Sequence, residues 1–192
     1  MYVVKTKKII RFLGIFLIVL SFILPLSINK YENKVIIAKR KEVNNYINKI
    51  NYSDNKFHYV AILEIPQIDL KLGLVDKNSN DNNVDKNIQI LDGSEFPNKI
   101  NTNLILASHS GTSKVSFFND LYKLSIGDTI YIYYNNYKYK YELNNIYEIK
   151  KTGAVDIIRN KDKNTIILIT CKNNDDNTQV IYIGYLIDKV DY

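Results

Sequence analysis

Short runs of β-branched and aromatic residues, separated by turn residues, occupy most of the chain from residue 57 onward. Such runs are typical of β-strands. We expect strands at 58–65, 67–74, 103–107, 129–134, 137–143, 154–159, 165–171 and 179–187. Because many short strands occur with few helical segments, the pattern predicts a mainly β fold, closed or nearly closed into an eight-stranded β-barrel.

Three connections between these runs also carry predictions. Asn135 and Asn136 stand between two alternating runs, and asparagine tolerates the positive φ values of a two-residue hairpin turn. Residues 115–124 are the best candidate for a short helix in this part of the chain. Residues 76–87 are polar throughout most of their length and predict a loop.

An uncharged apolar segment lies near the N-terminus, at residues 12–28. Its helix would be about 26 Å long, and extending it to residue 9 makes it long enough to span a bilayer. A cleaved signal peptide is the alternative, but the end of the segment has no small-residue cleavage pattern. We expect a cytoplasmic tail at 1–8, an uncleaved transmembrane anchor at 9–28, a helical stem and linker at 29–56, and a globular domain at 57–192.

The net charge of +6 is unevenly distributed. Residues 1–55 carry a net charge of +7, and the remaining residues carry −1. Basic residues that flank an apolar segment indicate contact with a membrane surface. Since the globular part is not basic, we do not expect nucleic-acid binding.

Cys171 is the sole cysteine of the chain, which excludes an intrachain disulfide and a cysteine-based zinc cluster. It stands at the end of the apolar run 165–171, before a polar loop, where a side chain can face solvent. A buried or incidental cysteine is the alternative, although structural cysteines usually lie deep in apolar runs. With His58 and His109 as the other candidates, we expect no transition-metal site.

His109 also follows an apolar run, residues 103–107, and precedes Gly111. A thiolate and an imidazole at two strand ends are the groups that cysteine acyl transfer requires, together with a donor for the oxyanion. A loop histidine with a local hydrogen bond is the alternative. His58 stands at the start of the first run and has no partner motif, so we interpret it as structural or surface-exposed.

The sequence ILITC at 167–171 resembles the TLxTC strand end of sortases, the membrane-anchored transpeptidases of Gram-positive bacteria. ASHSG at 107–111 is similar to their histidine loop, and residues 116–128 resemble the short helix and turn that follow it. The resemblance covers about residues 57–188. It implies an eight-stranded sortase-type barrel behind an N-terminal anchor, with the N-terminus in the cytoplasm and the catalytic domain outside the cell.

The resemblance also implies a reaction and a set of site residues. Cys171 would attack the Thr–Gly bond of an LPxTG-like sorting signal on a secreted surface protein and form a thioacyl-enzyme. An amine of a peptidoglycan precursor, or another amine acceptor, would then release the acyl group. His109 would act as general acid and then as general base, and Thr170 and Ser108 would bind substrate.

One position departs from the family pattern. Sortases place an arginine on the strand that follows the cysteine loop, and Gln179 is the best match here. Glutamine donates an N–H group but supplies no charge, and charge-assisted hydrogen bonds are about twice as strong as neutral ones. We therefore expect a slower enzyme or another cation at the site, with Lys172 as the nearest candidate in sequence.

Further expectations concern subclass, cofactors and alternative functions. The sequence has no second apolar segment after the domain and no obvious lid before residue 57, which favours an anchoring sortase over a pilus-polymerising one. Acidic residues at 175–176 and within 76–85 could bind calcium, but their spacing does not indicate it, so we expect no cofactor. A catalytically inactive membrane-tethered binding protein and a hydrolysing cysteine peptidase remain alternatives.

Overall fold

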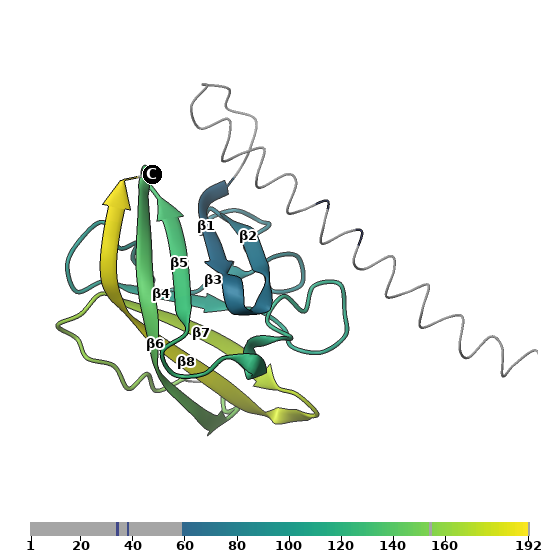
Figure 1. Ribbon diagram of the computed structural model, residues 1–192. Coiled ribbons are helices and arrows are strands. Elements are labelled where there is room, and N and C mark those ends of the chain that lie inside the picture. The colour runs from purple at the N-terminus through teal and green to yellow at the C-terminus, as the bar shows by residue number, and fades with distance from the viewer. Residues whose placement is uncertain (1–33, 35–37, 39–58, 154, 192) are drawn as a thin grey trace, which may run out of the picture. The chain divides into compact units, whose positions relative to one another are not determined.

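Eight strands form one sheet in the described part of this computed structural model (Figure 1). They are β1 (Tyr59–Ile65), β2 (Leu70–Val75), β3 (Gln89–Ile90), β4 (Asn103–Ala107), β5 (Thr129–Tyr134), β6 (Tyr137–Lys150), β7 (Thr165–Lys172) and β8 (Asp175–Asp191). Their order across the sheet is β2-β1-β5-β6-β8-β7-β4-β3. Because the two edge strands, β2 and β3, also contact each other, the sheet is a nearly closed barrel, as predicted.

The structure describes residues 34, 38, 59–153 and 155–191. Within these ranges, no helix has the length and apolar character needed to cross a membrane. The predicted tail and anchor, nearly all of the predicted stem, and His58 lie outside the described residues, so these predictions stay predictions.

The long strands β6 and β8 bend where their pairing register shifts, next to Tyr141 and Leu143. Such irregularities increase strand curvature and help a sheet to close. Gly184 of β8 lies opposite Leu143, at the second bend. A Cβ atom at Gly184 would lie 3.0 Å from Ile166 Cγ2 and 3.2 Å from the Glu142 carbonyl oxygen, so glycine permits this close approach.

The strand β7 is buried on both faces until its last two residues. On one face, alternate residues such as Leu168 join the barrel core. On the other face, five isoleucines from β4, β7 and β8 form a second cluster, against which Val155 and Ile157 of the β6–β7 connection pack. Burial on both faces explains why residues 165–170 form a continuous apolar run and not an alternating one.

The hairpin and β4 agree with the sequence-based predictions. Asn135 and Asn136 have φ values of 50° and 62°, as a two-residue turn between β5 and β6 requires. The strand predicted at 103–107 is β4, with the same bounds. Most other boundaries shift by a few residues, since a 3₁₀ turn, η1 (Pro66–Ile68), precedes β2 and both β6 and β8 extend further than expected.

Two predicted elements are wrong. Residues 155–159 do not form a strand: the Asp156 carbonyl and the Ile158 amide bond to the Tyr147 hydroxyl, and Val155 and Ile157 pack on the second cluster. The predicted helix at 115–124 contains only the 3₁₀ turn η2 (Leu121–Lys123). Phe118 and Leu121 are fully buried there, so a series of turns suffices to deliver the apolar side chains. The two-residue strand β3 was not predicted.

Candidate active site

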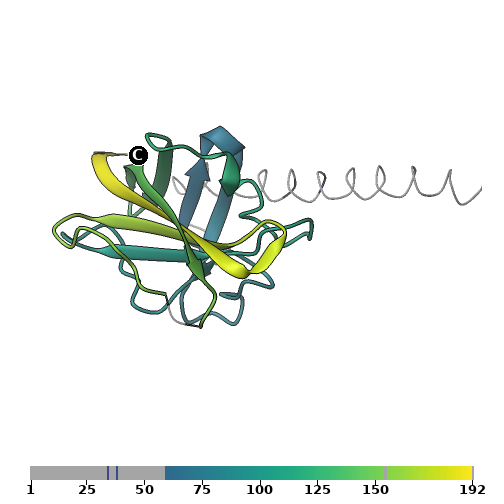
Figure 2. The ribbon, with the colours of Figure 1, turned by 90° about the horizontal axis from the view of Figure 1, so that it is seen from below.

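Cys171 is the second-last residue of β7, where the strand leaves the buried cluster. Ile167 and Ile169, which share its face of the strand, are buried, whereas Cys171 is partly exposed. The free thiol is therefore carried by a rigid buried strand and has an open side. Figure 2 shows β7 running beside β4 and β8, the two strands that flank it in the sheet.

The parallel pair β4–β7 brings the histidine loop to the same end of the sheet. Ala107 is the register partner of Ile169, and the Ser108 amide donates to the Ile169 carbonyl at 3.3 Å. His109 comes two residues after Ala107 and Cys171 two residues after Ile169. The two predicted catalytic residues therefore stand at the same ends of two neighbouring strands, which lie about 4.8 Å apart in a sheet.

His109 has its own carboxylate partner. Its Nε2 atom lies 2.9 Å from Asp85 Oδ1, and both side chains are substantially exposed. Asp85 belongs to the connection between β2 and β3, within the loop that the sequence predicts at 76–87. The histidine backbone is also held, because its carbonyl accepts a hydrogen bond from the Phe118 amide at 3.1 Å. The contact at Nε2 leaves Nδ1 for a different partner.

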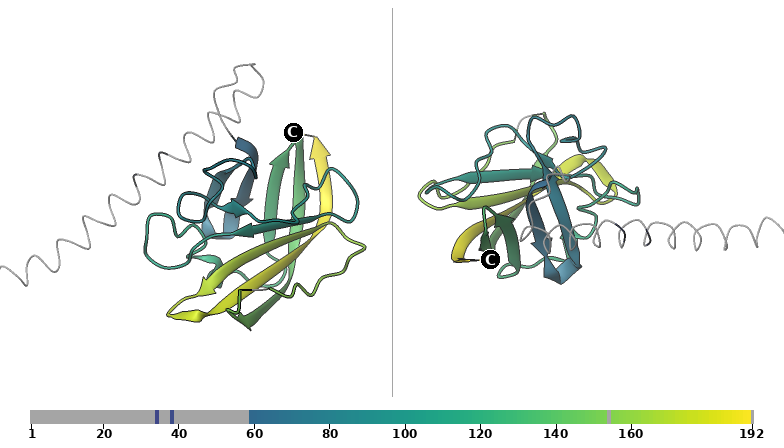
Figure 3. Two further views of the ribbon diagram at one scale, coloured as in Figure 1. Left: turned by 180° about the vertical axis from the view of Figure 1, so that it is seen from behind. Right: turned by 90° about the horizontal axis from the view of Figure 1, so that it is seen from above.

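Gln179 of β8 is the direct cross-strand partner of Cys171. Opposite residues of an antiparallel pair project from the same face, with Cβ atoms about 5 Å apart. Ile149 of β6 is in turn the partner of Gln179. The left view of Figure 3 shows the three strands β4, β7 and β8 crossing the barrel together. Their register puts the predicted oxyanion donor beside the thiol.

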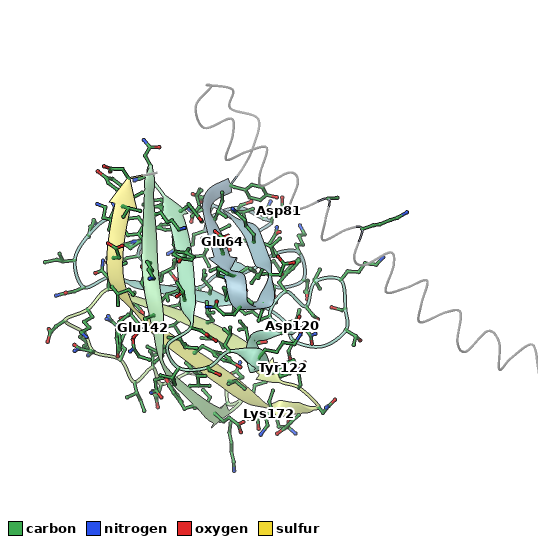
Figure 4. The ribbon with its side chains drawn as sticks, viewed as in Figure 1. Glu64, Asp81, Asp120, Tyr122, Glu142 and Lys172 are labelled. Carbon is green, nitrogen blue, oxygen red and sulfur yellow. The ribbon has the colours of Figure 1, made fainter. Side chains whose placement is uncertain are left out.

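The cation beside the thiol is Lys151 and not Lys172. Lys172 alternates to the opposite face of β7 from Cys171, and its Nζ bonds Glu148 Oε2 at 2.8 Å. This hydrogen bond to Glu148 raises the pKa of Lys172 above its ordinary value. Lys172 is labelled in Figure 4 near the end of β7 and the start of β8. Lys151, which directly follows β6, has its Nζ 3.7 Å from Cys171 Sγ.

Thr170 and Ser108 connect the two strand ends that carry the predicted catalytic residues. Both side chains are at least 95% buried. The Thr170 hydroxyl donates to the Ser108 carbonyl at 3.0 Å, and the Ser108 hydroxyl donates to the Val115 carbonyl at 3.3 Å. These hydroxyls therefore bond inside the fold and fix the positions of Cys171 and His109. Substrate binding by Thr170 and Ser108 stays a prediction.

The turn that follows Cys171 is held by Asp175. Its carboxylate accepts a hydrogen bond from the Thr178 hydroxyl at 2.6 Å and from the Asn177 amide at 3.0 Å. These bonds, the first above all, lower the pKa of Asp175 below its ordinary value. The turn also contains Asn174 in the left-handed region, with a φ of 63°. A defined turn of this kind fixes the side of the site next to the thiol.

Two tyrosines hold the β6–β7 connection against the face that leads to Cys171. The Tyr147 hydroxyl donates to the Asp156 carbonyl at 3.1 Å and accepts from the Ile158 amide at 3.2 Å. The Tyr185 hydroxyl accepts from the Asn160 amide at 2.8 Å. Because Tyr147 is on β6 and Tyr185 is on β8, the connection is attached to the same strands that carry the site.

The comparison with known families agrees with this geometry. The sortase domain model matches residues 63–186, which include every strand from β2 to β7 and the candidate site. The chain belongs to the sortase family. This finding confirms the family resemblance of the sequence motifs, and it makes the chain a sortase transpeptidase at the level of the family.

Individual sortases show the same relationship. The chain is 26% identical to sortase A of Bacillus anthracis over 150 residues, which are 78% of this chain and 70% of that protein. It is similar in fold to sortase A of Listeria monocytogenes, with a TM-score of 0.59, 23% identity, and coverage of 71% of this chain and 92% of that one. The sortase D5 transpeptidase of Clostridium perfringens gives a TM-score of 0.62, 22% identity, and coverage of 78% and 98%.

Two residues of this sortase site were not found from the sequence, Asp85 and Lys151. Both stand in polar segments among many other charged residues, and no local pattern distinguishes them. Among the residues that the structure describes, no group of three or more His, Cys, Asp or Glu side chains could hold a metal ion. In the loop considered for calcium, Asp81 instead pairs with Lys86 at 2.9 Å.

Proposed function

We propose that this sortase cleaves an LPxTG-like sorting signal through a thioacyl intermediate on Cys171 and transfers the acyl group to an amine of the cell wall. The observation that carries the proposal is the adjacency of two strand ends, one bearing a partly exposed thiol and the other an imidazole. A nucleophile and a general acid on rigid neighbouring strands need little reorganisation before reaction.

In the proposed reaction, the Cys171 thiolate attacks the carbonyl carbon of the threonine in the signal. A C–S bond forms, the C–N bond to the next residue breaks, and the departing amine takes a proton from the His109 imidazolium. In the second half, the neutral imidazole accepts a proton from the incoming amine. That amine forms a new C–N bond, the C–S bond breaks, and the thiolate is restored.

Gln179 is proposed to donate a side-chain N–H to the oxyanion of the tetrahedral intermediates. Its cross-strand register with Cys171 supports this role. A neutral donor at this point stabilises developing negative charge less than a charged one. We therefore propose that turnover is slower than it would be with an arginine guanidinium group in place of Gln179.

The proposed setting is the cell membrane, with a single anchor at residues 9–28, the N-terminus in the cytoplasm and the catalytic domain outside. The uncharged segment supports the anchor, and the likeness to membrane-anchored sortases supports the orientation. The proposed partners are sorting-signal peptides of secreted surface proteins and a peptidoglycan precursor or another amine acceptor.

The test is intact-mass spectrometry of the full-length chain in detergent, mixed with a panel of LPxTG-type peptides. We expect an acyl adduct on the wild-type chain, released by hydroxylamine, and no adduct on Cys171→Ala. With an amine acceptor present, the acyl-enzyme should be resolved to an amide product in place of the free acid. Release as free acid even with excess amine would instead identify a hydrolysing peptidase.

An inactive binding protein is the second candidate function, because Gln179 supplies no charge where the family pattern has arginine. Absence of any adduct across the panel, with the thiol free and the fold intact, would contradict the transpeptidase proposal. Retained peptide affinity under those conditions would support the binding protein.

A further inference from the structure

A lysine contacts the proposed nucleophile directly. Lys151 Nζ lies 3.7 Å from Cys171 Sγ, within the range of a hydrogen bond to sulfur. The lysine backbone is held next to the site, because its amide donates to the Asn177 carbonyl of β8 at 2.8 Å. The contact therefore starts from a backbone position that is hydrogen-bonded to the sheet.

The strand register explains why Lys151 reaches the thiol. Ile149, Gln179 and Cys171 form one row across β6, β8 and β7, and neighbours in such a row share a face. Lys151 is two residues beyond Ile149, so strand alternation directs it to that same face. Lys150 alternates to the other face, and it is exposed.

Other cations that could replace the family's arginine are engaged elsewhere. Lys172 pairs with Glu148 on the opposite face of the sheet. Arg159 is the only arginine of the described residues, and its Nη1 lies 3.5 Å from Thr165 Oγ1. Thr165 begins β7, so this guanidinium group is bound near the opposite end of the strand from Cys171, about 20 Å away.

We propose that Lys151 supplies the positive charge at the Cys171 thiol, while Gln179 supplies a neutral donor, so that these two residues divide a role usually given to one arginine. An ammonium group beside a thiol favours the thiolate, which is the nucleophilic form. The inference rests on the proposed function for its catalytic meaning, but the effect on the thiol requires no peptide substrate.

The direct test is the rate of alkylation by iodoacetamide, measured on the full-length chain in detergent. Because the chain has one cysteine, all alkylation reports on Cys171. Lys151→Met keeps most of the apolar stem and removes the charge. We expect it to slow alkylation at neutral pH by about threefold to tenfold. Lys151→Arg, which keeps the charge, should retain at least half of the wild-type rate.

Two controls separate a local charge effect from a general one. Lys150→Met removes the neighbouring charge from the other face and should leave the alkylation rate unchanged. Raising the salt concentration should slow the wild-type chain toward the rate of Lys151→Met, because salt screens an exposed charge pair. Thermal unfolding of each variant verifies that the fold is intact.

Equal alkylation rates for wild type and Lys151→Met would overturn the inference, as would equal losses in Lys150→Met and Lys151→Met. Lys151→Arg as slow as Lys151→Met would also overturn it, since the charge would then not be the cause. If alkylation slows as expected but wild type forms no acyl adduct with any peptide, the proposed function fails and the role of Lys151 at the thiol stands.

Discussion

At the scale of single residues, the contact between His109 and Asp85 predicts how much activity the Asp85 carboxylate contributes. The carboxylate restrains the imidazole and balances its charge when it is protonated, but both groups are substantially exposed. Exposed pairs typically contribute 0.2–1 kcal/mol. We expect Asp85→Ala to lower kcat/KM by about twofold to fivefold, measured with a fluorogenic sorting-signal peptide, and to leave the melting temperature almost unchanged.

Asp81→Ala is the matched control for this prediction. Asp81 is in the same loop and also forms an exposed ion pair, but its partner is Lys86 and not a site residue. It should leave kcat/KM at the wild-type value. If both variants lose activity equally, the loop as a whole matters and the specific role of Asp85 is wrong.

The same residues show what sequence reasoning can and cannot reach. Cys171 and His109 were identifiable because each interrupts a clear pattern, a reactive side chain at the end of an apolar run. Asp85 and Lys151 interrupt no pattern, since both stand among other charged residues in polar segments. Only strand register and loop path bring them to the site, and these depend on contacts between residues far apart in the chain.

At the scale of elements, the β6–β7 connection is attached to the sheet by hydrogen bonds to two tyrosine hydroxyls. Phenylalanine at Tyr147 keeps the ring packed on the isoleucine cluster but removes both hydrogen bonds. We expect Tyr147→Phe to speed amide exchange at Ile158 by about fivefold to tenfold, as the loss of about 1 kcal/mol of net hydrogen bonding implies. Hydrogen exchange read by NMR or mass spectrometry measures this directly.

Tyr122→Phe is the control, because Tyr122 is 62% exposed and belongs to η2, which is not part of that connection. Its exchange pattern at 155–160 should match wild type. An unchanged rate of amide exchange at Ile158 in Tyr147→Phe would show that apolar packing alone holds the β6–β7 connection in place.

The β6–β7 connection also explains an error of the sequence-based prediction. Residues 155–159 alternate between polar and apolar side chains much as an edge strand does, which is why a strand was predicted there. In the fold, this segment pairs with no strand, and Val155 and Ile157 pack on the isoleucine cluster. The segment satisfies its backbone through side chains instead, an outcome that depends on which strands pair. The hairpin and β4 were predictable because local residues decide them.

At the scale of the whole molecule, the burial of tyrosines makes the free energy of unfolding of the barrel depend on pH in the alkaline range. Burial raises the pKa of Tyr182 to about 12, and it raises the pKa of Tyr139 and Tyr141 as well. In an unfolded chain a tyrosine ionises near pH 10. Below that pH both states are neutral and the stability is fully present. As pH rises further, the unfolded chain loses protons first, so the free energy of unfolding falls.

Urea denaturation of the full-length chain as a function of pH tests this link. We expect the free energy of unfolding to decline from about pH 10 through pH 12, and the decline to be shallower in Tyr182→Phe. The exposed control Tyr122→Phe should reproduce the wild-type curve. Lys172 also has a raised pKa, so its contribution to stability is lost in the alkaline range as well. The comparison with Tyr182→Phe, and not the total decline, therefore isolates the part that comes from the ionisation of Tyr182. A decline of equal depth in wild type and Tyr182→Phe would mean that the ionisation of this buried hydroxyl does not oppose folding.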